Sequence, residues 1–194
     1  EWQKIRAGSI RLDRTFNAVS FSLGAGYTFY EDYLVGLTLS RTERAPSAEE
    51  LLSNGAHLAT GGFDIGDANL SKESGWTIEG TLRRKSGRWT GGVNMYLTQF
   101  ENFIYQENGI SCNASDDGSG NPICVPDASG GELQLRTFRQ NDVDFWGGEL
   151  TGAYDFYQST DCTGTVDIAF DWVRATVHDR PSDVLPRIPP YRIK

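Results

Sequence analysis

The apolar segments of this chain alternate between two kinds of residue, position by position. From residue 18 to residue 29, large apolar side chains occupy the odd positions and small or hydroxylic ones the even positions. Five further segments repeat this two-residue period. They begin near Tyr33, Trp76, Trp89, Trp146 and Val166. Because successive side chains of a β-strand point to opposite faces, the pattern predicts six strands, each with one apolar and one polar face.

The predicted strands are long, and aromatic residues collect at their ends. The segments run for about 9–12 residues, whereas strands of soluble proteins centre on about 5–6 residues and a tilted membrane-spanning strand needs about 9–11. The clustered aromatic residues are Phe29, Tyr30, Tyr33, Trp89, Phe156 and Tyr157. Such clusters are typical of the aromatic girdles that membrane barrels place at the bilayer interfaces.

The connections between these segments alternate between short and long. Short links are expected at residues 30–33, where Glu31 and Asp32 form the tip, at Ser86–Arg88, and at residues 158–164. Long connections cover residues 43–74 and 108–132, and a further proline-rich loop opens near His178. Outer-membrane barrels have short periplasmic turns and long extracellular loops. We therefore predict an all-β fold, an antiparallel up-and-down transmembrane β-barrel segment whose long loops face outward.

Six strands are too few to close such a barrel. The smallest bacterial outer-membrane barrels have about eight strands, and an open sheet in lipid would leave backbone groups unpaired at its edges. We therefore expect the chain to supply part of a larger barrel. It begins with Glu1-Trp2-Gln3 and not with a signal peptide, so we also expect the true N-terminus of this exported protein to lie upstream.

Charge and motif content narrow the function classes. The net charge of −8 disfavours nucleic acid as a partner. The chain has no apolar run of the ~18 residues that a transmembrane helix requires. It contains no G-x-S-x-G, H-E-x-x-H or P-loop motif. We therefore expect neither an enzyme nor a bound cofactor.

Three cysteines suggest one disulfide. Cys112 and Cys124 lie in the same long connection, and an oxidising compartment favours a bond between them. Such a bond is worth roughly 3 kcal/mol in the chain-entropy account. The alternative is two free thiols; a metal site is less favoured, because no histidine accompanies them and their spacing is too wide. Cys162 is left as an odd cysteine, free or paired elsewhere.

Several motifs in this chain resemble those of one receptor family. R-A-P-S-A-E-E-L at residues 44–51 precedes G-A-H-L-A-T-G-G-F-D-I-G-D-A-N-L-S-K-E at residues 55–73. F-E-N-F-I-Y at 100–105, N-D-V-D-F-W-G-G-E at 141–149 and L-P-R-I-P-P at 185–190 follow in order. Together they resemble the β-barrel of TonB-dependent outer-membrane receptors, over nearly the whole chain from about Arg14.

The resemblance implies active uptake across the outer membrane of a Gram-negative bacterium. In that family a barrel of about 22 strands encloses an N-terminal plug, and TonB delivers energy through the plug. Residues 1–194 would then be a partial receptor barrel without the plug domain and the barrel C-terminus. The implied ligand is scarce and metal-containing, such as zinc or an iron–siderophore. The expected partners are the lipid bilayer, TonB and this small ligand.

Residues 42–74 hold the first candidate ligand site. The G-x-H-x-A-T motif around His57 is most similar to a branch of the family that includes zinc-uptake receptors. Asp64, Asp67 and Glu73 lie in the same segment, and histidine nitrogens and carboxylate oxygens suit Zn²⁺. We therefore take His57, Asp64 and Asp67 as candidate metal ligands. The alternative is a segment ordered by turn chemistry, with Ser47 and Glu50 forming a capping box for a helix over residues 48–53 and a turn at Gly66-Asp67.

His178 is the fourth candidate metal ligand. It opens another outward loop beside Asp179 and Asp183, and one hypothesis is a site shared by His57 and His178. Residues 116–121 have some likeness to a calcium loop, but they lack the bidentate glutamate, so a flexible loop is the better interpretation.

The remaining charged residues fit the polar face of the strands. Six should face the barrel lumen, where they hydrate it or pair with a plug. They are Glu79, Arg83, Glu149, Asp155, Asp167 and Asp171.

Two other functions are compatible with parts of the pattern. A passive porin-like channel has the same strand pattern without energised transport. A soluble β-sandwich binding module also alternates, but it predicts that Val19, Phe21 and Leu23 are buried against a second sheet.

Overall fold

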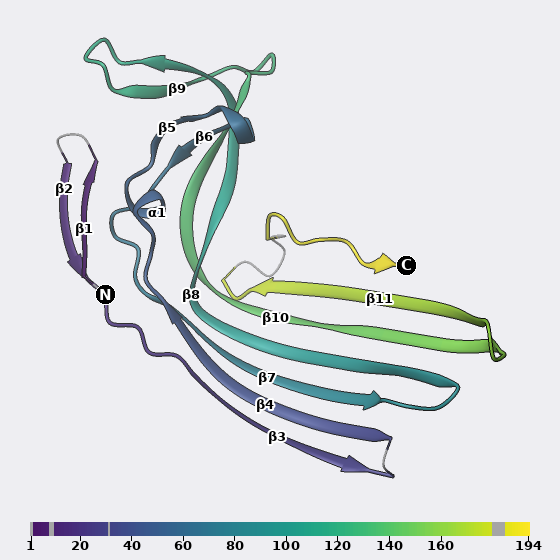
Figure 1. Ribbon diagram of the computed structural model, residues 1–194. Helices are drawn as coiled ribbons and strands as arrows, with labels where there is room; N and C mark the ends of the chain where they lie inside the picture. The colour runs from purple at the N-terminus through teal and green to yellow at the C-terminus, as the bar shows by residue number, and fades with distance from the viewer. Residues whose placement is uncertain (1, 8–9, 31, 180–184) are drawn as a thin grey trace. The chain divides into compact units, whose positions relative to one another are not determined.

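The computed structural model describes residues 2–7, 10–30, 32–179 and 185–194 (Figure 1). Glu31, Pro181 and Asp183, which the sequence assigns to loops, lie outside these residues. The elements in chain order are β1 (Trp2–Ala7), β2 (Ile10–Thr15), β3 (Phe21–Phe29), β4 (Tyr33–Arg44), α1 (Ala48–Leu52), β5 (Asn54–His57), the 3₁₀ turn η1 (Leu58–Thr60), β6 (Gly62–Ile65), β7 (Glu73–Arg84), β8 (Trp89–Asp116), β9 (Pro122–Pro126), β10 (Leu133–Gln158), β11 (Thr163–Val177) and β12 (Arg192–Ile193).

The chain divides into two compact units. The first, here the loop unit, comprises Glu1–Ala18, Glu43–Ser74 and Asn102–Asn141. The second, here the wall unit, comprises Val19–Thr42, Gly75–Glu101 and Asp142–Lys194. Each unit is described by itself.

The wall unit confirms all six predicted strands. Hydrogen-bonded neighbours follow the order β12-β11-β10-β8-β7-β4-β3, so the long strands pair in the order in which the chain makes them. Strand β3 pairs antiparallel with β4 from Phe21↔Arg41 to Phe29↔Tyr33. Strand β10 pairs antiparallel with β11 from Val143↔Val177 to Gln158↔Thr163. The three short links are tight, as predicted, because the strands on either side begin and end within a few residues of each other.

The apolar face of the wall unit is open. Val19, Phe21 and Leu23 are 65%, 52% and 75% exposed, and the apolar residues of the other strands share this exposure. A β-sandwich would bury these side chains between two sheets. Their exposure contradicts the sandwich alternative and fits a wall whose apolar side meets lipid.

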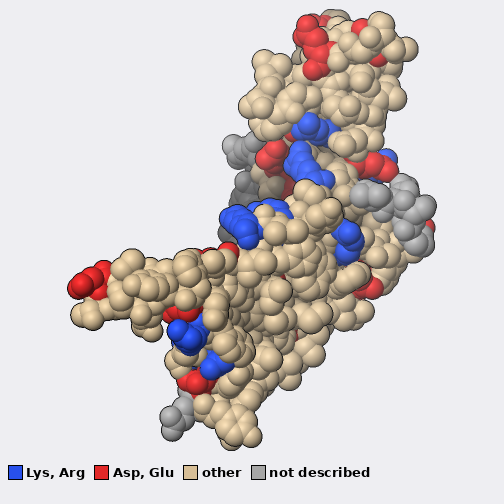
Figure 2. All heavy atoms as spheres, turned by 90° about the vertical axis from the view of Figure 1, so that its right-hand side faces the viewer, with Lys and Arg blue, Asp and Glu red and all other residues tan. Residues whose placement is uncertain are grey.

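The polar face of the wall unit carries hydrogen bonds between strands. The hydroxyls of Thr77 and Thr98 lie 2.8 Å apart, and the Thr81 hydroxyl donates to Asn94 Oδ1 at 2.7 Å. On the side of the molecule shown in Figure 2, charged atoms gather in small groups separated by wide uncharged areas. The two faces therefore differ as the alternation in the sequence predicts.

Aromatic rings gather beside the tight turns of the wall unit. The ring centroids of Phe29 and Tyr33 lie 5.4 Å apart, and those of Tyr33 and Trp89 lie 6.4 Å apart. Phe29 also meets Tyr30, the first residue of its turn, at 5.7 Å. Residues from three strands thus form one aromatic belt at the level of the turns, as an interfacial girdle requires.

The loop unit contains the predicted helix. Helix α1 ends one residue before the predicted boundary, and Ser47 and Glu50 form the expected capping box. Arg44 holds the helix to the strands, because it pairs with Glu50 at 2.8 Å and with Glu73 at 3.1 Å. Glu73 is buried and also accepts a hydrogen bond from the Ile104 backbone N–H. None of the described helices is long and apolar enough to cross a membrane.

Two small hydrophobic cores lie inside the loop unit. The first gathers Leu51 of α1 with Leu70, Ile104 and Phe138. The second gathers Phe63 of β6 with Cys112 and Leu133. Each core joins side chains far apart in sequence, so the long connections are packed structures and not free loops.

The expectation of a loop over residues 108–132 is wrong for most of its length. Strand β8 continues to Asp116, and β9 returns along it with Cys112 opposite Pro126 and Asp116 opposite Pro122. The sequence does not reveal this strand extension, because the segment has polar residues at both odd and even positions and so lacks the sustained apolar–polar alternation of the wall strands. Residues 116–121 form the tip, where Asp117 accepts hydrogen bonds from the backbone N–H groups of Ser119 and Asn121.

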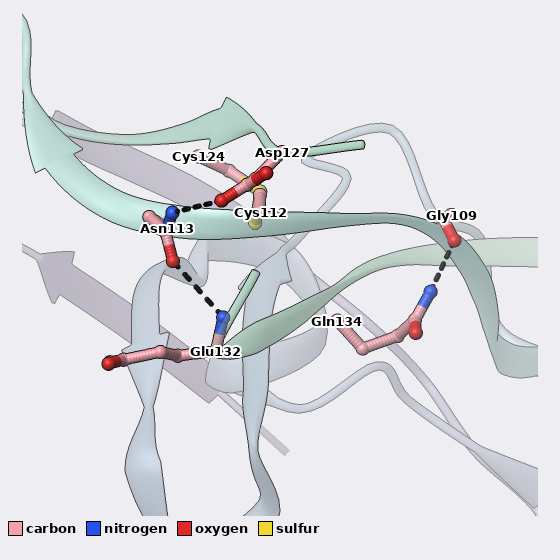
Figure 3. Close-up of a disulfide and its surroundings, with 7 residues drawn as sticks. All are labelled: Gly109, Cys112, Asn113, Cys124, Asp127, Glu132 and Gln134. Atoms are coloured by element: carbon pink, nitrogen blue, oxygen red, sulfur yellow. Dashed lines mark hydrogen bonds between the residues drawn. A yellow bond between two sulfur atoms is a disulfide. The ribbon is translucent and has the colours of Figure 1, made fainter. Parts of the chain in front are cut away.

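The disulfide between Cys112 and Cys124 is confirmed (Figure 3). It ties β8 to β9, with the two Cα atoms 5.5 Å apart. Asn113, the residue after Cys112, adds two hydrogen bonds beside the disulfide. Its side chain donates to Asp127 at 2.9 Å and accepts from the Glu132 backbone N–H at 3.1 Å. Cys162 is an exposed free cysteine.

A further pairing was not expected from the sequence. Strands β5 and β6 form a small antiparallel hairpin, and β6 pairs in parallel with the first residues of β10, from Gly62↔Gln134 to Ile65↔Thr137. This pairing fixes the part of the chain that carries the G-x-H-x-A-T motif.

Replacing both Cys112 and Cys124 by serine should loosen the β8–β9 hairpin, because the bond closes the strand pair and is worth roughly 3 kcal/mol. In the full-length protein, limited proteolysis should then cut between residues 113 and 123 much faster. Cys162→Ser is the matched control and should leave the cutting rate unchanged. Equal rates in the double variant and the parent would show that the disulfide does not hold the hairpin.

Candidate metal centre

Helix α1 presents Glu49 at the surface of the loop unit. Glu50 is turned back to the Ser47 backbone N–H at 2.7 Å by the capping box, whereas Glu49, one position earlier, is exposed. Leu51 anchors the helix in the first core. The helix also sits close to Gly66, where an added Cβ would lie 2.7 Å from the Leu51 carbonyl carbon. Glu49 therefore projects from a short helix that is held at both its cap and its buried side.

The β5–β6 hairpin brings His57 and Asp64 onto one face. Gly55 lies directly opposite Asp64, and His57 follows Gly55 by two residues on the same face. Because Gly55 has no side chain, the diagonal between His57 and Asp64 stays open. His57 Nδ1 and Asp64 Oδ2 lie 3.3 Å apart.

Glu49, His57 and Asp64 form one group of three potential ligands. One ligand atom from each lies within 4.8 Å of the others. The three side chains line a surface hollow of about 390 Å³. His57 is half-exposed and Glu49 exposed, whereas Asp64 is 4% exposed, so the group has a buried floor and an open mouth.

One oxygen of Asp64 has no hydrogen-bond partner in the described residues. Oδ1 is buried, and Nη1 of Arg136 is also buried and unpartnered. Both atoms face the bare Cα of Gly62, where an added Cβ would lie 3.0 Å from Oδ1 and 2.8 Å from Nη1. The other terminal nitrogen of Arg136 donates to the Thr60 carbonyl at 2.8 Å. A buried carboxylate oxygen without a donor costs free energy unless a cation or water meets it.

These three residue types suit a first-row divalent metal. A histidine nitrogen and carboxylate oxygens bind Zn²⁺ at about 2.0–2.2 Å, and three protein ligands leave a fourth position open for water or another molecule. The His57–Asp64 distance already matches the separation of two ligands in such a shell. A small rotation of the exposed Glu49 side chain would complete the set.

The other residues predicted as ligands have separate roles. Asp67 is not in the group of three; its Oδ1 accepts a hydrogen bond from the Asn69 backbone N–H at 2.8 Å and so closes a turn. Glu73 is held by Arg44 and Ile104. His57 and His178 each pair with a different carboxylate, Asp64 and Asp144 respectively.

His178 follows the end of β11 in the wall unit. Its Nε2 lies 3.0 Å from Asp144 Oδ2, and its backbone N–H donates to the Asp142 carbonyl at 2.9 Å. The hydrogen bond that the His178 ring donates to Asp144, followed by the negative charges of Asp144, Asp142 and Asp179, raises the pKa of His178 above its ordinary value. Protonation therefore strengthens this pair and competes with metal binding at the same nitrogen.

The polar face of the wall unit contains a second hollow, of about 950 Å³. Its charged lining residues are Arg83, Arg84, Lys85, Glu149, Asp167 and Lys194, and small, hydroxylic and apolar residues make up the rest. Asp155 accepts a hydrogen bond from the Thr165 hydroxyl at 2.7 Å, and Asp171 pairs with Arg192 at 3.0 Å. Charges of both signs on this face suit a hydrated surface, and among the described residues of this face no three potential metal ligands come together.

Glu49 is the residue of the group that sequence reasoning missed. It belongs to no motif with metal-ligand spacing, since eight positions separate it from His57. The capping box provided the only signal, because it predicts a helix immediately before the G-x-H-x-A-T motif and directs Glu50, not Glu49, toward the helix cap.

The raised pKa of His178 gives a pH prediction. A histidine whose folded pKa is raised contributes stability that is complete below its ordinary pKa of about 6.5 and is lost as the pH rises through the folded value. Asp144→Asn should lower the His178 pKa toward the ordinary value. Histidine NMR titration of the full-length protein would measure both values, with His178→Gln for assignment. An identical pKa in the Asp144→Asn variant would contradict the ion pair.

Two solved structures resemble this chain. The copper transporter OprC aligns with a TM-score of 0.64 at 14% identity over 89% of this chain. The siderophore receptor PirA from Pseudomonas aeruginosa aligns with a TM-score of 0.53 at 16% identity over 80% of this chain. The chain spans 22% of the length of the first and 25% of the second. At these identities, the likeness supports the fold.

The family described as TonB dependent receptor-like, beta-barrel matches residues 2–194. That match covers the wall strands as well as the segment that carries the candidate metal centre. Proteins of this family are receptors and transporters of the Gram-negative outer membrane. The chain therefore belongs to the TonB-dependent receptor family, as part of a β-barrel in the outer membrane.

Proposed function

We propose that this chain is part of a TonB-energised receptor that takes up a scarce metal ion or metal chelate, and that Glu49, His57 and Asp64 contact the metal. In this proposal the plug and the remaining strands of the barrel come from other parts of the full-length polypeptide. The two free sheet edges and the share of the solved receptors that the chain spans support this arrangement.

The buried, unpartnered oxygen of Asp64 is the observation that carries the proposal. In the loop unit, Glu50 and Glu73 are satisfied by hydrogen bonds and ion pairs. At Asp64, Oδ1 has no donor among the described residues, while the second oxygen of the carboxylate, Oδ2, lies 3.3 Å from His57 Nδ1. A divalent cation would bind this carboxylate and the neighbouring His57 nitrogen together.

The net charge of the site favours reversible binding of a metal ion. Glu49 and Asp64 contribute two negative charges, neutral His57 none, and the neighbouring Arg136 one positive charge, so the net charge around a bound cation is −1. A site of this charge attracts a divalent cation without the full attraction of the two carboxylates. Together with its open mouth, this suits a receptor that must release its cargo.

The comparisons support the class of cargo. One similar structure is a copper transporter and the other a siderophore receptor. Histidine and carboxylate ligands are suited to zinc and copper alike. They would bind the metal directly, or occupy open positions on the metal of a chelate.

Metal binding by the full-length receptor tests the group of three. We expect His57→Ala and Asp64→Asn each to weaken Zn²⁺ or Cu²⁺ binding at least tenfold in calorimetry, because loss of an outer-shell partner alone costs about 10–100-fold. Glu49→Gln should weaken it less, since Glu49 is exposed. Asp67→Asn keeps its turn and His178→Ala removes the other histidine, so both should leave the affinity unchanged.

Unchanged affinity in both His57→Ala and Asp64→Asn would remove this site from the proposal. Uptake measured with and without TonB tests the energised receptor separately. Uptake that continues without TonB would support a passive channel instead, whatever the result at His57.

A further inference from the structure

Arg84 stands out on the apolar face of the wall unit. It ends β7, in phase with Trp76, Ile78 and Leu82, which are 42%, 47% and 46% exposed on that face. Arg83, the preceding residue, is in phase with Thr77, Glu79 and Thr81 on the opposite face, although both arginines contribute to the lining of the hollow of about 950 Å³. The strand phase of Arg84 and its ring contacts therefore place its guanidinium with the aromatic belt at the level of the tight turns.

Aromatic rings hold the Arg84 guanidinium. Its Cζ lies 3.9 Å from the ring centroid of Trp89 and 5.5 Å from that of Tyr33. These rings come from the strands on either side of β7 and belong to the aromatic belt. Stacking of this kind fixes the plane of the guanidinium and leaves its N–H edge free to bind an anion.

Nothing in the described residues neutralises Arg84. Its Nε is buried without a hydrogen-bond partner, and no ion pair forms between Arg84 and a described carboxylate. The nearby Asp32 carboxylate accepts a hydrogen bond from the Ser86 hydroxyl. A half-buried arginine on a lipid-facing wall needs an anion to satisfy it.

The tight turn is shaped around this side chain. Gly87 has φ of +99°, and an added Cβ there would lie 2.8 Å from Nη2 of Arg84. The Lys85 backbone N–H donates to the Asp32 carbonyl at 2.8 Å, which joins this turn to the neighbouring one. Lys85 and Arg88 add two more cations within four residues of Arg84 in the sequence. The turn therefore combines a bare glycine, a stacked guanidinium and local positive charge.

We propose that Arg84, Trp89 and Tyr33 form a binding site for the headgroup phosphate of an anionic glycerophospholipid. The ligand is a lipid and not free phosphate, because the arginine lies on the face whose neighbours are exposed apolar side chains and at the height where tryptophan and tyrosine meet headgroups. The guanidinium fork binds two phosphate oxygens, and the neighbouring cations favour an anionic lipid over a zwitterionic one.

Native mass spectrometry of the full-length receptor, titrated with phosphatidylglycerol in mild detergent, tests the site. Arg84→Gln should weaken lipid binding by about tenfold, the loss expected for one charge-assisted bidentate contact. Arg83→Gln is the matched control: it removes the same charge one residue away on the other face and should change binding less than twofold. Arg84→Lys keeps the charge but loses the fork and should fall between them.

Several outcomes would overturn the proposal. Equal weakening by Arg83→Gln and Arg84→Gln would show a general charge effect, and unchanged binding in Arg84→Gln would show no site. Displacement of the lipid by millimolar inorganic phosphate would identify free phosphate as the ligand. Equal affinity for phosphatidylethanolamine would remove the preference for an anionic lipid. Heat-dependent migration of the folded barrel on gels checks that each variant is folded.

Discussion

Backbone hydrogen bonding between long neighbouring strands is the constraint on which this protein depends. A bilayer offers no water to an unpaired N–H or C=O, so a strand in lipid must pair along its whole length on both sides. The wall unit pairs its long strands in chain order, which satisfies the strands inside the sheet and leaves its edge strands to pair elsewhere. Side chains are then free to differ between the two faces, and the exposed apolar face from Val19 to Leu23 shows that they do.

The same constraint favours the loop unit as the place for a specific ligand site. Lipid occupies one face of the wall and the other carries mixed charges, so a specific ligand group has to be built on the long connections. There the Arg44–Glu50–Glu73 ion pairs hold helix α1, and the β5–β6 hairpin aligns His57 with Asp64. Glycine at Gly55 and Gly62 keeps both flanks of the Asp64 carboxylate free of side chains. The proposed ligand group is therefore a product of packing and not of local sequence spacing.

Much of the fold follows from local rules that the sequence displays. The six wall strands, the tight turns, the capping box at Ser47 and the Cys112–Cys124 bond each depend on a short-range pattern or on a single pairing choice. The parallel contact of β6 with β10 and the extension of β8 to Asp116 depend on long-range contacts, which no two-residue period reveals. His57 and Asp64 could be named from their chemistry, but Glu49 joined them only through the fold, and Asp67 has the right chemistry in a turn-closing position.

The central claim is that the alternation along these strands separates lipid from water. Spin labels placed one at a time from residue 93 to residue 98 of β8, in the full-length receptor with Cys162 replaced and reconstituted in bilayers, test it directly. Collision with oxygen should be high at Val93, Met95 and Leu97, and collision with a water-soluble nickel chelate should be high at Asn94, Tyr96 and Thr98. A two-residue period with opposite phases for the two reagents is the predicted result. Low oxygen collision at Val93, Met95 and Leu97, as in the core of a soluble sandwich, would contradict it.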